Sequence, residues 1–171
     1  MRVINVHERR LGAAPERVGA LLDQLASEED QLWPRKHWPP MRFDRPLAPG
    51  AAGGHGPIRY TVEEYRPGAL LRFRFTGPRG FVGHHRFEVL AGGPGCILRH
   101  TLELEPKGAA RLSWLLLFRP LHDALVEDAF GCAQAALGEA QLLRPWSPWV
   151  RILRWVLARG RKRPGRPRDP R

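Results

Sequence analysis

The chain has 171 residues and a mass of 19.4 kDa, which predicts one domain with a short extension and argues against a multidomain protein. The 28 Lys and Arg against 17 Asp and Glu give a net charge of +11. Of this excess, +9 lies in residues 144–171 and only +2 in residues 1–143. A near-neutral body with a basic tail lacks the broad basic surface that nucleic-acid binding needs.

The cysteine content and the first residues indicate the compartment. Cys96 and Cys132 are too few for a disulfide scaffold, and the chain opens without the features of a secretory signal. No apolar run reaches the roughly 18–20 residues that span a bilayer. We therefore expect a reduced, cytoplasmic protein. Arg outnumbers Lys 25 to 3, which is typical of a GC-rich bacterial genome.

The first third of the chain predicts a strand, two small helices and a loop. Residues 3–11 are expected to form the strand. Pro15 then begins an amphipathic helix to about residue 26, with apolar residues at helical spacing. A shorter helix is predicted over residues 27–33. Residues 34–57 are rich in Pro and Gly and are expected to hold at most one short strand, near residues 41–47. Their four glycines, at 50, 53, 54 and 56, match no phosphate-binding loop and predict a mobile loop.

A four-strand meander follows, with clear turn signals. The strands are predicted at residues 58–65, 69–76, 81–90 and 96–105, separated by Pro- and Gly-containing turns. Because the turns are too short for crossover helices, the strands must be antiparallel.

The last third is helical. Residues 110–118 suit either a final strand or a helical lead-in, and residues 121–143 have the pattern of a long, Ala-rich helix. A second amphipathic helix is predicted over residues 149–158, and residues 160–171 have the composition of a disordered segment. We divide the chain into a ligand-binding domain, residues 1–143, and a basic extension, residues 144–171.

This order of elements predicts an α+β helix-grip fold. In it, a curved antiparallel sheet of about six or seven strands wraps around a long C-terminal helix, with two small helices after the first strand. One helix cannot fill the concave face of such a sheet, so a cavity is expected between them.

The chain resembles the START/Bet v1-like superfamily, also called SRPBCC or polyketide cyclase/dehydrase-like, over residues 3–140. The resemblance lies in the element order and in the segments ERRLGAAPERVGALL, RFEV, LRHTLEL and FRPLHDALVEDAF. It implies a helix-grip fold, shared by lipid carriers, hormone sensors and cyclases, and it does not select one function among them.

Side-chain alternation along the strands and the helical period identify the residues that face the cavity. Asp123, Glu127 and Gln134 fall on the opposite side of the long helix, which we expect to face solvent. The predicted ligand-binding residues are Tyr60, Phe73, Phe75, His85, Phe87, His100, Leu102, His122, Val126 and Ala129.

Three histidines and a tyrosine in this set require partners, since an unpaired buried polar group costs about 1–3 kcal/mol. They are either satisfied core residues or contacts for a polar atom of an apolar ligand. No metal site and no cofactor are predicted, because no pair has metal-ligand spacing on one helix and no inward carboxylate is evident. Trp33 and Trp38 suit either a pocket lid or packing under the sheet edge.

Two functions remain open. The first is binding or transport of a hydrophobic small molecule, lipid or polyketide-like. The second is a cyclase- or aromatase-type enzyme, in which His100 or His85 acts as a general base and Tyr60 holds a carbonyl oxygen. No catalytic residue is assigned.

The basic extension has its own pattern. Its apolar residues at helical spacing are Trp149, Ile152, Leu153, Val156 and Leu157, with arginines on another arc. Such a helix suits docking at the surface of an anionic membrane, which would place the protein peripherally at the inner face of the membrane. It equally suits folding back onto the body.

Overall fold

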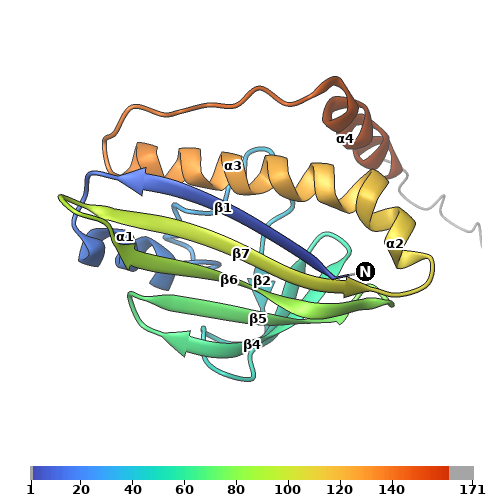
Figure 1. Cartoon of the computed structure of the whole chain (residues 1–171), viewed down its shortest axis with the longest axis horizontal. Helices are drawn as coiled ribbons and strands as arrows, with labels where there is room; N and C mark the ends of the chain where they lie inside the picture. The colour runs from blue at the N-terminus through green and yellow to red at the C-terminus, as the bar shows by residue number, and fades with distance from the viewer. Residues whose placement is uncertain (1, 162–171) are drawn as a thin grey trace, which may run out of the picture.

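The computed structural model describes residues 2–161. Seven strands form one antiparallel sheet in the order β1-β7-β6-β5-β4-β3-β2, and the long helix α3 lies across one face (Figure 1). Sheet and helix have the predicted α+β helix-grip arrangement. The bounds are β1 Val3–Leu11, α1 Pro15–Asp23, β2 Arg42–Phe43, β3 Ala52–His55, β4 Ile58–Arg66, β5 Leu70–Gly77, β6 Phe81–Ala91, β7 Cys96–Pro106, α2 Ala110–Ser113, η1 Trp114–Phe118, α3 Arg119–Ala136 and α4 Pro148–Arg161.

The second small helix, predicted over residues 27–33, is not formed. Ala26 has a φ of 67°, which ends helical geometry after α1. The Asp30 carboxylate then accepts hydrogen bonds from the backbone N–H groups of Ala26, Leu32 and Trp33. An aspartate that caps its own turn competes with the helix, and here the turn replaces the helix.

Gly53 and Gly54 lie in β3, so the prediction of a mobile loop is wrong for these two glycines, while Gly50 and Gly56 lie in the turns on either side of the strand. Gly53 pairs with Phe43 of β2 and Tyr60 of β4, and Gly54 pairs with Arg42 of β2 and Arg59 of β4. A Cβ at Gly54 would overlap the Ile58 carbonyl, and its φ of 153° is one that L side chains rarely adopt. These glycines allow the backbones of β2, β3 and β4 to approach closely.

The four meander strands have the predicted order and lie within one or two residues of the predicted bounds. Residues 110–118 form the helical lead-in rather than a strand. They comprise α2 and the single π-helical turn η1, which run into α3 without a break.

The long helix is shorter than predicted. It ends at Ala136 instead of residue 143, and Gly138 follows with a φ of 76°, a left-handed position that terminates helices. The chain then runs back along α3 as an irregular segment, and α4 lies beside η1 and α3 (Figure 1). The predicted disordered segment, residues 160–171, lies almost entirely outside the described residues.

Candidate functional site

A cavity of about 590 Å³ lies between the sheet and α3. Its floor comes from β5, β6 and β7, its roof from α3, and its mouth from η1, α4 and the loop before β2. The apolar lining consists mainly of Trp33, Trp38, Phe75, Phe81, Phe87, Trp114, Phe118, Ile58, Leu102, Leu117, Leu121, Leu125, Val126 and Leu157. The polar side chains in the lining are His37, His55, His85, His100, His122 and Arg154.

The structure brings most of the predicted ligand-binding residues to this cavity. Seven of the ten line it: Phe75, His85, Phe87, His100, Leu102, His122 and Val126. The other three, Tyr60, Phe73 and Ala129, are fully buried in the core outside the lining.

Two of the cavity histidines form a pair on the sheet. His85 Nδ1 lies 3.2 Å from His100 Nε2, so one ring nitrogen donates and the other accepts. His85 stacks between Phe73 and Phe75, with ring centroids 4.9 and 5.0 Å away. Burial lowers the pKa of both histidines well below the usual range, and the neighbouring imidazoles lower it further. Both rings are therefore neutral at pH 7.

His122 differs because it has a carboxylate partner. It enters the cavity from α3, with its ring centroid 5.0 Å from that of His100. Its Nδ1 lies 3.2 Å from Oδ1 of Asp123, and its Nε2 is buried and without a hydrogen-bond partner among the described residues. Burial lowers the pKa of His122, although Asp123 opposes this effect.

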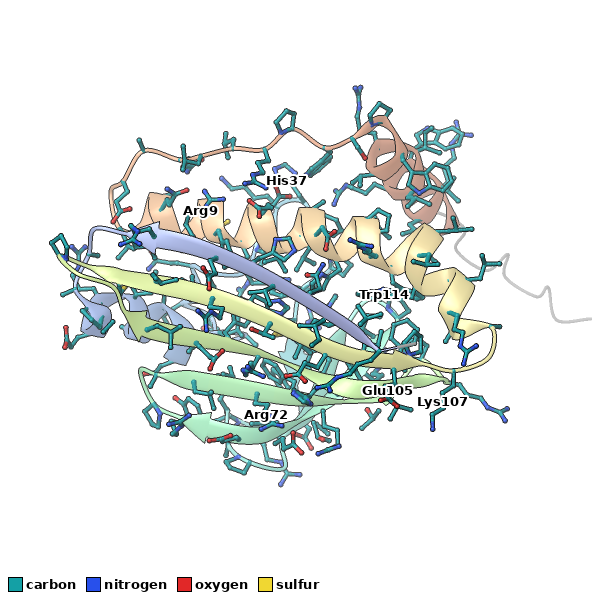
Figure 2. All side chains as sticks on the ribbon, viewed as in Figure 1. Arg9, His37, Arg72, Glu105, Lys107 and Trp114 are labelled. Carbon is teal, nitrogen blue, oxygen red and sulfur yellow. The ribbon has the colours of Figure 1, made fainter. Side chains whose placement is uncertain are left out.

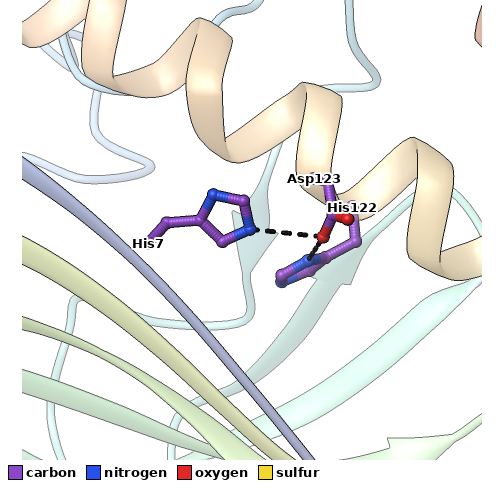
Figure 3. A group of neighbouring side chains, drawn as sticks. All are labelled: His7, His122 and Asp123. Atoms are coloured by element: carbon purple, nitrogen blue, oxygen red, sulfur yellow. Dashed lines mark hydrogen bonds and ion pairs between the residues drawn. The ribbon is translucent and has the colours of Figure 1, made fainter.

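Asp123 connects the cavity to a polar layer between α3 and β1. Its Oδ1 also lies 3.2 Å from His7 Nε2 (Figure 3). The same oxygen accepts a hydrogen bond from Asn5 Nδ2 at 3.0 Å. The Nδ1 of His7 lies 3.0 Å from Glu127 Oε1. Burial alone would lower the pKa of His7, but the hydrogen bonds with Asp123 and Glu127 outweigh it and raise that pKa. His7 is thus poised to carry a proton on each ring nitrogen.

Arg9 completes this polar layer, which we call the seam: Asn5, His7 and Arg9 of β1 against Asp123, Glu127 and Gln134 of α3. Arg9 is 6 % exposed and lies between the strand and the helix (Figure 2). It donates to Glu127 Oε2 at 2.7 Å and to Gln134 Oε1 at 2.8 Å.

The expectation that Asp123, Glu127 and Gln134 face solvent is therefore wrong for Glu127 and Gln134, while the side chain of Asp123 is half-buried, with 35 % of it exposed. Gln134 is 4 % exposed, and the side chain of Glu127 is 11 % exposed. The inward positions of β1 carry polar side chains, while its apolar Ile4 and Val6 are 60 % and 50 % exposed on the outer face. This strand buries its polar face, so the matching polar stripe of α3 is buried against it.

At the mouth of the cavity, two tryptophans contact an aspartate and an arginine. Asp128 accepts hydrogen bonds from the indole N–H of Trp38 at 2.7 Å and of Trp146 at 3.0 Å. The guanidinium of Arg154 lies 4.4 Å from the Trp38 ring and 4.0 Å from the Trp146 ring. These contacts fix α4 on the body, where Val150 is buried and Leu157 lines the cavity.

Trp33 and Trp38 are both buried, and both line the cavity. Other lining residues were missed, above all Trp114, Phe118 and Leu121 at one end and Arg154 at the mouth. The continuous helical period from residue 110 onward is the signal that could have identified the first three. Nothing local in the sequence places Arg154 there, because its position depends on the reversal of the chain after α3.

His7, His122 and Asp123 are also the described residues best placed to hold a metal, since their ligand atoms lie within 4.8 Å of one another. Hydrogen bonds within the seam already occupy Asp123 Oδ1 and both nitrogens of His7 without one. Three donors converge on Asp123 Oδ1, and both nitrogens of His7 have carboxylate partners. We therefore treat the group as a hydrogen-bond network that reaches the cavity through His122.

Comparisons with known proteins show the fold. No protein-family model and no curated protein sequence matches the chain. Among solved structures, Ara h 8.0201 is similar with a TM-score of 0.60 and 9 % identity, over 81 % of this chain and all of that one. Norcoclaurine synthase from Thalictrum flavum gives a TM-score of 0.61 and 14 % identity, over 81 % and 96 % of the two chains. CalU16 from Micromonospora echinospora gives 0.57 and 11 %, over 94 % of each.

At these identities the likeness establishes the architecture alone. It confirms the fold that the sequence predicted. Within residues 2–161, none of the helices has the length and apolar character needed to cross a bilayer.

Proposed function

We propose that the protein binds and carries a hydrophobic small molecule, lipid or polyketide-like, in the cavity between the sheet and α3. The observation that supports this most is the lining, which combines aromatic and aliphatic side chains with neutral buried imidazoles. A volume of about 590 Å³ is within the range of small-molecule pockets. Norcoclaurine synthase, which has the same fold, has been solved in complex with dopamine and hydroxybenzaldehyde, so this architecture accommodates small aromatic molecules.

Titration with the apolar fluorescent probe N-phenyl-1-naphthylamine tests the proposal. Leu121→Trp adds a ring into the cavity and should weaken probe binding at least about tenfold. Ile4→Trp, on the exposed outer face of β1, is the matched control and should bind as the wild type does. Equal affinity of the two folded variants would show that the probe binds elsewhere and that the cavity is not the site.

A cyclase- or aromatase-type activity is the second candidate, and the hydrogen bond between His122 and Asp123 favours it. A histidine held by a carboxylate is the usual form of a general base. The base is then His122 rather than His100 or His85, which have no carboxylate partner, and Tyr60 is outside the cavity lining. StfQ, the aromatase/cyclase di-domain protein of the steffimycin biosynthetic pathway, shares the fold with a TM-score of 0.58 and 14 % identity, and the match covers half of its chain.

Native mass spectrometry of protein purified from its own host separates the two candidates. A carrier should release an apolar molecule that is unchanged after incubation with fresh protein. An enzyme should convert the molecule, and His122→Leu should stop the conversion.

We further propose that the protein exchanges its ligand with an anionic membrane surface and is located peripherally on the cytoplasmic side. The support is a continuous apolar surface at the cavity mouth. On α4, Trp149, Ile152, Trp155 and Val156 are 46–55 % exposed, although the helix is docked on the body. The Trp149 indole donates to the Leu116 carbonyl at 2.8 Å, which joins this face to the exposed leucines 112, 115 and 116.

The arginines around this surface have the charge that anionic lipids attract. Arg111, Arg119, Arg151 and Arg159 are exposed on the same elements. Each basic residue near an anionic leaflet contributes about 1 kcal/mol, and the indole rings suit the headgroup region. Of the five tail residues predicted to face a membrane, Leu153 is half-buried, and Leu157 is 48 % exposed at the cavity mouth.

Co-sedimentation with vesicles of 30 % phosphatidylserine in phosphatidylcholine tests the proposed membrane binding. Ile152→Glu/Trp155→Glu should reduce the bound fraction at least about tenfold. Ile4→Glu/Val6→Glu removes two side chains of similar exposure from the other face of the sheet and should bind like the wild type. Equal losses in the two variants, or no binding by the wild type, would contradict the membrane role.

A further inference from the structure

His122 presents one ring nitrogen to the cavity and the other to a carboxylate. Its Nδ1 lies 3.2 Å from Asp123 Oδ1, while the side chain is among those that line the cavity. Asp123 is itself held by His7 (Figure 3) and by Asn5, both on β1. The imidazole orientation is therefore fixed from behind by three residues of the seam.

The partner of Nδ1 determines which nitrogen bears the hydrogen. Hydrogen bonds with His122 and His7 lower the pKa of Asp123, although burial opposes this shift, so the carboxylate is ionised and accepts. His122 must then donate through Nδ1, and Nε2 is left as a bare acceptor. This Nε2 is buried and finds no hydrogen-bond partner in residues 2–161. A buried acceptor without a partner costs about 1–3 kcal/mol, which a ligand donor would offset.

The rest of the lining restricts what that donor can be. The described residues that line the cavity include no Asp or Glu, so a protonated amine would enter without a counter-charge. His85 Nδ1 and His100 Nε2 bond to each other, and burial keeps both rings neutral. His100 Nδ1 also has no partner among the described residues, but no carboxylate fixes which of the His100 nitrogens bears the hydrogen. A neutral hydroxyl on an apolar body is the donor that this environment favours.

We infer that Nε2 of His122 accepts a hydrogen bond from a hydroxyl group of the ligand, and that Asp123 positions the ring for this bond. The inference rests on the proposed binding function and deepens it, because it names one specificity-determining atom and the ligand group that it selects. His122 is the contact residue, and Asp123 acts through it as a positioning residue.

A pair of probes that differ only in the donor tests the inference. 2-Naphthol and 2-methoxynaphthalene share the ring system, and only the first can donate. The measured quantity is the ratio of their dissociation constants, by fluorescence titration or calorimetry, so that general changes in cavity affinity cancel. Wild-type protein should prefer 2-naphthol, and His122→Leu should reduce this preference about tenfold, the effect of one lost hydrogen bond.

Three further variants make the test specific. His55→Leu is the matched control. His55 also lines the cavity, with its ring centroid 4.8 Å from that of Trp33, but it has no carboxylate partner, and the preference should be unchanged. His122→Gln retains a side-chain acceptor and should keep part of the preference. Asp123→Asn should lower the preference while leaving the affinity for 2-methoxynaphthalene within about twofold, which a merely structural change would not do.

The outcomes separate this inference from the function on which it rests. If both probes bind and the preference is the same in wild type, His122→Leu and His122→Gln, the hydrogen bond is excluded while the cavity remains a binding site. An equal loss in His55→Leu would also overturn the assignment to His122. If neither probe binds to wild-type protein, both proposals fail together.

Discussion

The two sides of α3 bury histidines in opposite electrostatic environments. Toward the cavity, His85 and His100 have only aromatic, aliphatic and imidazole neighbours, and burial lowers their pKa values. Toward β1, His7 lies between Asp123 and Glu127, and its pKa is raised despite burial. The charge of a buried imidazole is thus decided by whether a carboxylate reaches it and not by burial alone.

This difference assigns a separate task to each side. On the cavity side, the imidazoles of His85 and His100 bond only to each other, and Nε2 of His122 is an acceptor without a partner among the described residues. These are properties of a surface that binds a ligand. The seam has every charge paired, which holds β1 and α3 together without an apolar interface. His122 and Asp123, adjacent in the chain, connect the two sides.

The largest loss of stability is expected from a substitution in the seam. Arg9→Met should lower the free energy of unfolding by about 3–5 kcal/mol, because it leaves the Glu127 carboxylate buried without its closest cation. Urea denaturation monitored by circular dichroism measures this loss, and Arg10→Met, on the exposed face of the same strand, is the control. The double variant Arg9→Met/Glu127→Leu should recover part of the loss. A loss below about 1 kcal/mol in Arg9→Met would show that the seam does not hold the helix.

The cavity histidines should make the protein less stable in acid. Their folded-state pKa values are lowered, so the stability that they contribute is present above the unfolded value of about 6.5 and is lost as the pH falls below it. An imidazole that remains neutral when folded lowers the free energy of unfolding by about 2 kcal/mol between pH 7 and pH 5.

His85→Asn/His100→Asn should therefore flatten the acid limb of the stability profile, measured by urea denaturation at several pH values. A wild type whose stability does not change between pH 7 and pH 5, or a double variant with the same slope as the wild type, would contradict the neutral cavity.

Protonation of His7 should stabilise the folded protein in acid, which is opposite to the effect of the cavity histidines, and the change in the free energy of unfolding should be smaller. Its folded-state pKa is raised, so its contribution is fully present below the unfolded value of about 6.5 and is lost as the pH rises through the folded value. His7→Gln should cost about 1 kcal/mol more stability at pH 6 than at pH 8.5, measured by the same denaturation method. The same cost at both pH values would mean that His7 is neutral and that the two sides of α3 do not differ.

The sequence predicted the cavity side of the molecule far better than the seam. Alternation in β7 correctly placed His100 and Leu102 inward, because apolar residues mark the buried face of that strand. The same reasoning failed for the polar stripe of α3. Periodicity identifies which residues share a face, but the partner of that face decides whether it is buried.

The order of elements was predictable for a similar reason: Pro and Gly punctuate the meander at each turn. The missing second small helix and the early end of α3 were not predictable in this way. They depend on the Asp30 side chain, which caps a turn, and on a left-handed glycine at 138. The position of α4 depends on Asp128 and Arg154, which are far apart in the chain and meet around Trp38 and Trp146.

The smallest expected effect concerns an ion pair of the same chemistry on the outer face of the sheet. Arg99 Nε lies 2.6 Å from Glu8 Oε1, closer than Arg9 lies to Glu127, but the side chains are 35 % and 45 % exposed instead of 7 % and 11 %. Water and salt screen an exposed pair, and its loss leaves two groups that water can solvate. Arg99→Gln should therefore cost at most about 0.5–1 kcal/mol in urea denaturation, and the cost should fall further in 0.5 M NaCl. The cost of Arg9→Met should be nearly independent of salt. If the two variants cost the same at low salt, burial would not be what gives the seam its strength.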